Sequence, residues 1–248
     1  MRYFLTFSYD GTAYHGWQRQ PNALGVQEVL DGALTTLLRQ PVATVGAGRT
    51  DAGVHASCMV AHFDADVADE AWLADKLNRL LPPDIAVSGV RRVRPEAHAR
   101  FDAVRRTYHY HVYMRKDPFQ RHFATRLFFR PDFDRMNEAA AWLCGVEDFT
   151  SFSKLHSDAK TNICHVSQAE WVDLGDGTWR FVISADRFLR GMVRAVVGTL
   201  FEVGRGRMDL GQFRSVVEAR NRCAAGDSVP ACALSLVEVA YPPEVYQV

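Results

Sequence analysis

The chain has 248 residues, of which 48% are hydrophobic and 23% are charged, and its 29 basic and 29 acidic residues cancel. These proportions are typical of a globular protein with one large domain or two ordinary ones. No apolar run approaches the length of a membrane span, and the aromatic start predicts a first strand rather than a signal peptide. Five scattered cysteines without a Cys-x-x-Cys pair favour reduced thiols in a cytoplasmic protein, and argue against a zinc site or a disulfide framework.

The zero net charge hides a segregation of charge along the chain. Residues 91–130 hold eleven Arg and Lys against three acids, and residues 187–222 hold eight Arg against three acids. Arginine suits phosphate because its planar guanidinium donates two hydrogen bonds at once. A single basic segment is usually just a solvated face, but two of them favour an RNA-binding surface.

Hydrophobic periodicity and breaker residues predict the order of the elements. They indicate a strand over 2–9, a helix over 26–38, strands on both sides of residues 46–54, a helix over 69–81, strands over 85–93 and 107–113, a helix over 134–143, strands over 163–174 and 179–185, a helix over 187–204 and a strand over 234–240.

The glycine-rich stretch 46–56 lies between two apolar runs. This pattern predicts a strand, a stiff loop and a second strand, with Asp51 at the tip of the loop. Arg49 lies two residues earlier, so a locally extended backbone would place both side chains on one side. An arginine so close favours the ionised carboxylate, which a nucleophilic or charge-stabilising aspartate requires. The ordinary alternative is a structural Arg-Asp pair in a loop.

Residues 48–56 read Gly-Arg-Thr-Asp-Ala-Gly-Val-His-Ala, and this string resembles the signature of the tRNA pseudouridine synthase A family. The resemblance places the family's catalytic aspartate at Asp51. The strings Tyr-Asp-Gly-Thr at 9–12 and Gly-Trp-Gln at 16–18 are similar to the family's opening motifs. Asp10 in the first of them is a rival carboxylate, although the neighbouring glycine makes a turn the simpler explanation.

Residues 106–110, Arg-Thr-Tyr-His-Tyr, are similar to the family's Arg-x-Tyr-x-Tyr, which implies an active-site tyrosine at Tyr108. Strand alternation puts Tyr108 and Tyr110 on one face. Such rings are ordinarily packing residues. The functional interpretation is that one of them stacks on a base turned out of its helix.

Residues 188–194, Phe-Leu-Arg-Gly-Met-Val-Arg, resemble the family's Phe-Leu-x-x-Met-Val-Arg. The resemblance places at Arg194 the arginine that pairs with the catalytic aspartate. In the helix expected over 187–204, Arg187, Arg190 and Arg194 would form a stripe, with Gly191 and Gly198 leaving room for a close approach on the same edge. Most basic helix faces are only solvated.

The resemblance spans residues 9–236 and implies an α+β fold. It implies two similar halves, each an antiparallel sheet backed by helices, with the active-site cleft between them. We therefore expect domains at 1–104, carrying the catalytic Asp loop, and at 105–248, carrying the Tyr, Arg and Leu of the pocket. The expected catalytic residues are Asp51, Tyr108 and Arg194, and the expected substrate-binding residues are Arg49, Arg106, Tyr110, Arg190 and Leu234, the last of which would line a uracil pocket.

The implied function is isomerisation of uridine to pseudouridine at positions 38, 39 and 40, in the anticodon stem-loop of transfer RNA, by a homodimer. No cofactor or metal is expected, because the reaction oxidises nothing and removes no group from the RNA. The ionised carboxylate could attack ribose C1′ covalently or stabilise and deprotonate a sugar intermediate.

Three alternatives remain at this point. A paralogue could modify another RNA position, because the chain departs from the family pattern at Ala97, Glu147, Gly191 and Ala233. A non-catalytic RNA-binding module would need only the basic surface. A two-carboxylate hydrolase such as a glycosidase would need a second acid beside Asp51, for which Asp10 is the weak candidate.

Overall fold

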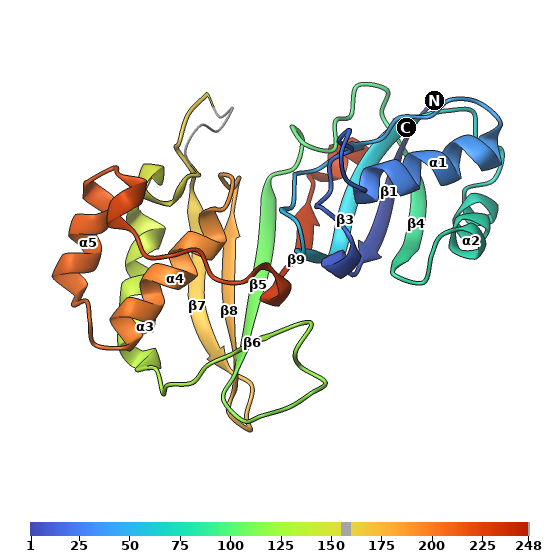
Figure 1. The fold of residues 1–248 in the computed structure, drawn as a ribbon. Coiled ribbons are helices and arrows are strands. Elements are labelled where there is room, and N and C mark those ends of the chain that lie inside the picture. The colour runs from blue at the N-terminus through green and yellow to red at the C-terminus, as the bar shows by residue number, and fades with distance from the viewer. Residues whose placement is uncertain (155–159, 248) are drawn as a thin grey trace. The chain divides into compact units, whose positions relative to one another are not determined.

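The computed structural model describes residues 1–154 and 160–247, and the chain separates into two compact units. Unit 1 comprises Met1–Arg106 and Ser235–Val248, and unit 2 comprises Thr107–Leu234. Both units combine strands with helices (Figure 1), which confirms the α+β class. In the described part of the chain, no helix has the length and apolar character needed to cross a membrane.

Unit 1 is built on a sheet with the strand order β4-β1-β3-β9. Its elements are β1 (Arg2–Tyr9), α1 (Val26–Leu38), β2 (Val45–Gly46), β3 (His55–Asp64), α2 (Glu70–Leu80), β4 (Ile85–Val93) and β9 (Leu234–Ala240), whose first residue belongs to unit 2. The centre of the sheet is β1, which pairs antiparallel with both β3 and β4. Five of its eight residues are buried, and the other three, Arg2, Thr6 and Ser8, are partly exposed.

The C-terminal strand β9 joins unit 1 by a parallel pairing with β3, with His55 opposite Ser235 and Ala56 opposite Leu236. The sheet is therefore mixed, although antiparallel pairing predominates in it. The pairing places residues 235–248 in the same unit as the N-terminal strand, about 230 residues away along the chain. It also fixes His55 and Ala56, the first residues of β3, which end the loop that carries Asp51.

Among its described residues, unit 2 contains the strand order β5-β8-β7 and three α-helices. Its elements are β5 (Arg105–Tyr113), which begins in the last two residues of unit 1, β6 (Thr125–Arg126), α3 (Phe133–Trp142), β7 (Val166–Asp173), β8 (Thr178–Ala185), α4 (Met192–Gly204) and α5 (Leu210–Glu218). Helix α3 packs on β7 and on α4. The buried ring of Trp171 on β7 contacts Phe133, Phe181 and Phe201 from three other elements, and this cluster holds the helices on the sheet.

Most of the predicted elements are confirmed. Helix α1 has the predicted bounds and ends at Arg39, whose left-handed backbone (φ 54°) stops the helix before Pro41. Asp69 caps α2 by accepting a hydrogen bond from the Trp72 amide, so the expected start at 69 is its N-cap. Strands β4 and β9 also have the predicted bounds, and β7 begins three residues later than expected.

Candidate active site

The Asp51 loop, residues 46–56, is held by its buried members. The Thr50 side chain points inward, where its hydroxyl lies 2.9 Å from that of Tyr9. The His55 ring is buried as well, and its Nδ1 accepts a hydrogen bond from the Gly11 amide at 3.0 Å. Between them the Val54 amide donates to the Asp51 carbonyl at 3.1 Å, which closes a tight turn. The loop therefore has a fixed backbone at the aspartate itself.

The side chains on either side of Thr50 face outward. Arg49 is exposed and Asp51 is partly exposed, while Thr50 between them is buried. This alternation is that of a locally extended backbone, on which residues i and i+2 share a side. A carboxylate that is accessible yet carried by a rigid loop is the arrangement that a nucleophile or general base requires.

The segment 10–17 packs against the Asp51 loop, and two glycines in it let the two backbones come close together. A Cβ at Gly11 would lie 2.1 Å from the Val54 carbonyl oxygen, and one at Gly16 would lie 2.4 Å from the Thr50 carbonyl oxygen. Gly16 also has φ +89°, a backbone conformation that residues with a Cβ rarely adopt. The two N-terminal motifs therefore act as a clamp on the backbone that presents Asp51.

Asp10 has a local role in this clamp. Its Oδ1 accepts hydrogen bonds from the Thr12 amide at 2.9 Å and the Thr12 hydroxyl at 2.6 Å, and so caps the short helical turn Gly11–Ala13. The geometry is that of an N-cap aspartate. It supports the turn interpretation of Asp10 over its interpretation as a second catalytic acid.

The Arg106 side chain contacts the start of the Asp51 loop and is only 9% exposed. Its guanidinium donates to three backbone carbonyls: those of Ala47 at 2.9 Å, of Ala103 at 2.8 Å and of Arg100. These bonds satisfy buried acceptors on two segments of unit 1. Sequence reasoning expected Arg106 to bind substrate. The structure places its charged head among backbone carbonyls next to the Asp51 loop.

In unit 2, the two tyrosines of β5 have different surroundings. Tyr108 is 9% exposed, and its ring meets Phe188 edge-on at 5.0 Å between centroids. Tyr110 is fully buried, and its hydroxyl lies 2.7 Å from that of Thr125 on β6. Burial raises the pKa of Tyr110 above its usual value. Its hydroxyl therefore joins β6 to β5, whereas Tyr108 lies nearer the protein surface.

The helix predicted over 187–204 is wrong at its start. Helix α4 begins at Met192, because Gly191 has φ +73° and a left-handed residue cannot continue a right-handed helix. Arg187 and Arg190 therefore precede the helix and do not form a stripe with Arg194. Arg190 is exposed, and its carbonyl accepts from the Lys154 amide at 2.9 Å.

Arg194 lies in the first turn of α4 and is held by the segment that follows α5. Its Nε donates to the Val229 carbonyl at 2.7 Å, and the Val229 amide donates to the Arg194 carbonyl at 3.2 Å. The room predicted beside Gly198 belongs to the same segment, since a Cβ there would lie 1.8 Å from the Asp227 carbonyl oxygen. The missing side chain at Gly198 thus leaves space for the backbone at Asp227. Leu234, 5% exposed, starts β9.

Sequence reasoning missed the structural role of Arg106 and of the glycines in the clamp. Each role depends on a carbonyl from a distant segment: Ala47 is 59 residues from Arg106, and Thr50 follows Gly16 by more than 30. Strand alternation places Arg106 on the face of Tyr108 and Tyr110, unlike its exposed neighbour Arg105, but it does not show which acceptors the guanidinium meets. The motif resemblance marks these positions as important without giving the reason.

Known proteins match this chain along nearly all of its length. A profile described as tRNA pseudouridine synthase matches residues 5–102 and 139–242. Proteins named tRNA pseudouridine synthase A from Bacteroides thetaiotaomicron and Bacteroides fragilis are 60% and 56% identical to the chain; each alignment covers 99% of it, and 92% and 98% of the relative, respectively. The protein of that name from Bacillus subtilis is 38% identical, over 97% of this chain and 99% of its own length. The chain therefore belongs to the tRNA pseudouridine synthase family.

Proposed function

We propose that this protein converts uridine to pseudouridine at positions 38, 39 and 40, in the anticodon stem-loop of transfer RNAs. The observation that carries the proposal is the Asp51 loop: a partly exposed carboxylate lies on a backbone fixed by Thr50, His55 and two close-packed glycines. The family match over both units supports the same reaction.

The reaction breaks the bond between ribose C1′ and uracil N1 and joins C1′ to C5. C5 releases its proton and N1 takes up a proton, so the product is an isomer of the substrate. The Asp51 carboxylate is the proposed essential group, acting at the sugar. The family resemblance supports Arg194 as the cation that keeps this carboxylate charged and aligned, and Tyr108 as the ring that stacks on the uracil. It also supports Leu234 as a pocket residue. Exposure supports Arg49 and Arg190 as groups that bind RNA phosphates.

The proposed roles divide between the two units. Asp51 and Arg49 belong to unit 1, and Tyr108, Arg194 and Leu234 belong to unit 2. Arg106 and Tyr110 contribute as positioning residues, because their polar groups bond to Ala47 and Thr125 within the protein. We further propose a homodimer that works in the cytoplasm, as the resemblance implies.

Release of tritium from C5-labelled uridine in a tRNA transcript tests the function. The wild type should release tritium, and transcripts with cytidine at positions 38, 39 and 40 should release none. Asp51→Asn should abolish release while keeping affinity for the tRNA, because the shape of the side chain is retained. Asp10→Asn is the matched control, since asparagine also caps helical turns and should leave most of the release rate.

The alternatives give different results in this assay. A non-catalytic RNA-binding module would bind tRNA and release no tritium with either protein. A paralogue would release tritium from uridines outside positions 38–40. If Asp51→Asn released tritium as fast as the wild type, the assignment of the carboxylate would be wrong. Loss of all activity in Asp10→Asn, with folding intact, would favour a mechanism with two acids.

A further inference from the structure

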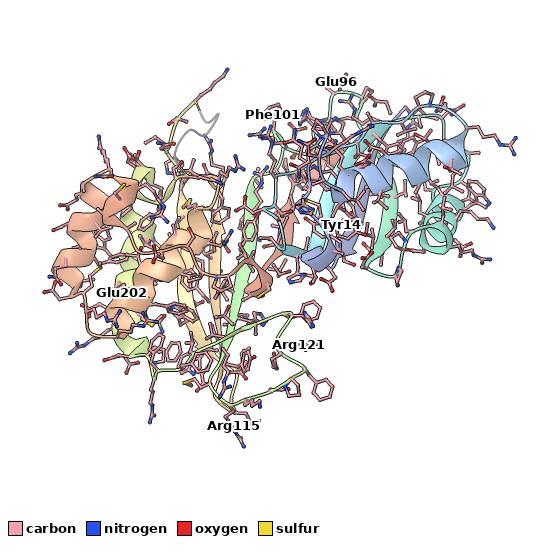
Figure 2. All side chains as sticks on the ribbon, in the orientation of Figure 1. Tyr14, Glu96, Phe101, Arg115, Arg121 and Glu202 are labelled. Atoms are coloured by element: carbon pink, nitrogen blue, oxygen red, sulfur yellow. The ribbon has the colours of Figure 1, made fainter. Side chains whose placement is uncertain are left out.

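A basic loop connects β5 to α3 in unit 2, and of its residues only Thr125, the partner of Tyr110, entered the site described above. We define it as residues 114–130. It carries five cations and a single acid, Asp117; the cations are Arg115, Lys116, Arg121, Arg126 and Arg130. Figure 2 shows Arg115 and Arg121 on this loop, beyond the end of β5. Its formal charge of +4 stands out in a chain whose total is zero.

The five cations have no acidic partners within residues 1–154 and 160–247. No carboxylate there lies within ion-pair distance of any of them, whereas Arg2, Arg105 and Arg220 elsewhere pair with Asp64, Glu238 and Asp148. The single acid of the loop is occupied locally, because its Oδ1 accepts a hydrogen bond from the Phe119 amide at 2.8 Å. The positive charge of the loop is therefore available to an anionic partner.

The same loop exposes aromatic rings. Phe119 is 89% exposed, Phe128 is 85% exposed and Phe123 is 50% exposed. The guanidinium of Arg126 lies over the Phe128 ring, 4.9 Å from its centroid. Burying a phenylalanine side chain stabilises a folded protein, so several rings left in water on one short segment mark a binding surface.

The loop is folded and anchored at its base. Thr125 and Arg126 pair in parallel with Val112 and Tyr113 of β5, and the Tyr110 hydroxyl bonds to that of Thr125. At the far end, the Gln120 carbonyl accepts from the amides of Phe123 and Ala124 at 3.0 and 2.9 Å. Rings and cations held on a formed loop lose less conformational entropy on binding than those on a free tail.

We propose that the basic loop is an RNA-binding surface, on which Phe119 and Phe128 stack on unpaired bases while the surrounding arginines and the lysine bind phosphates. Single-stranded nucleic acid offers flat base faces on which exposed rings can stack, and regularly spaced negative charge for the cations. That the RNA is a transfer RNA rests on the proposed function. None of these rings and cations is among the groups assigned to the reaction, so we expect them to contribute to affinity and to leave the chemical step unchanged.

The charge distribution favours RNA over a second copy of this chain. Two copies meeting at this loop about a symmetry axis would bring together two surfaces that each carry +4 with Asp117 included. Like charges at an interface oppose association. An RNA partner gains from the same charges by releasing counterions.

The test compares two double variants with matched controls on α2. Phe119→Ala with Phe128→Ala removes the rings, and Arg115→Gln with Arg121→Gln removes two charges. The controls are Trp72→Ala, an aromatic ring that is 46% exposed, and Arg79→Gln, an exposed arginine paired with Asp75. Affinity for a tRNA transcript is measured by fluorescence anisotropy at several salt concentrations, and kcat and KM by tritium release.

We expect the ring variant to weaken tRNA binding at least about tenfold, with KM raised and kcat unchanged. The charge variant should lower the slope of log affinity against log salt by about 0.7–0.9 for each RNA phosphate that is no longer neutralised by an arginine. The two α2 variants should bind as the wild type does. Unchanged affinity in both loop variants would overturn the proposal.

Sedimentation velocity separates the remaining outcomes. If the ring variant changed the oligomeric state and lost affinity only as a result, the loop would be an interface between copies and the proposal would be wrong. If the wild type bound tRNA through this loop and released no tritium, the proposed function would fail and the RNA-binding surface would stand. If the wild type did not bind tRNA, both would fail.

Discussion

Replacing Arg106 tests whether this residue supports the Asp51 loop or binds RNA. Arg106→Ala removes one charged donor from three backbone carbonyls, those of Ala47, Arg100 and Ala103. A hydrogen bond to a charged group contributes about 1.5–3 kcal/mol, and acceptors that share one donor are not additive. We therefore expect the free energy of unfolding to fall by about 3–5 kcal/mol. Arg106→Lys should recover part of the lost free energy of unfolding, because an ammonium group donates hydrogen bonds but cannot reach all three carbonyls.

The measurement is urea unfolding followed by tryptophan fluorescence, with hydrogen exchange of the amides in residues 46–56 as a local readout. Arg105→Ala is the control, because this neighbouring arginine pairs with Glu238 in solvent and its replacement should leave the unfolding curve unchanged. We expect faster exchange of the loop amides only in the Arg106 variants. If Arg106→Ala kept the stability of the wild type and had reduced affinity for tRNA, the side chain would bind RNA directly and the reasoning from its buried bonds would be refuted.

Three further substitutions follow from the backbone and from one buried histidine. Gly16→Ala should lower the free energy of unfolding, measured in urea, by about 2–4 kcal/mol and should reduce tritium release, because its Cβ would press on the Thr50 carbonyl. Gly32→Ala in α1 is the control: its Cβ meets nothing within 4 Å, so it should raise the free energy of unfolding by about 1 kcal/mol. Gly191→Ala should cost about 1–2 kcal/mol in the same assay, since φ is +73° there. Burial, and then the nearby cations, lower the pKa of His62 to about 4 from an unfolded value of about 6.5. The unfolded state binds more protons between these values, so wild-type stability should fall as the pH drops from about 6.5 to 4, and His62→Asn should flatten that slope in urea unfolding at successive pH values.

Each of these three predictions can be contradicted by a particular result. A Gly16→Ala protein as stable and active as the wild type would show that the backbone of segment 10–17 can shift to accept a Cβ without loss of stability. A Gly191→Ala protein of unchanged stability would mean that α4 can begin elsewhere. An identical pH slope in His62→Asn would assign the acid sensitivity to other groups.

Local sequence signals were sufficient for most helices and strands. Asp69 caps α2 by its own side chain, and Pro82 ends the same helix one residue beyond its C-cap, so both boundaries are determined within a few residues. The alternation of residues 2–9 likewise predicts β1 without distant information. The start of α4 was predicted wrongly because Gly191 is compatible with a helix as well as with the left-handed conformation, and the local pattern does not choose between them.

Periodicity and breaker residues predicted the order of the main elements and the loop that carries Asp51, and the family resemblance added the α+β class. Which charged and polar groups bond within the protein, and which stay exposed, became visible only in the folded structure. Arg106 and the exposed arginines of the basic loop look alike along the chain. They differ because folding brings the distant Ala47 carbonyl, together with the nearby carbonyls of Arg100 and Ala103, to the buried Arg106 guanidinium, while Arg115 and Arg121 are exposed. The role of such a side chain depends on whether folding buries it against acceptors, and that is decided by contacts between segments.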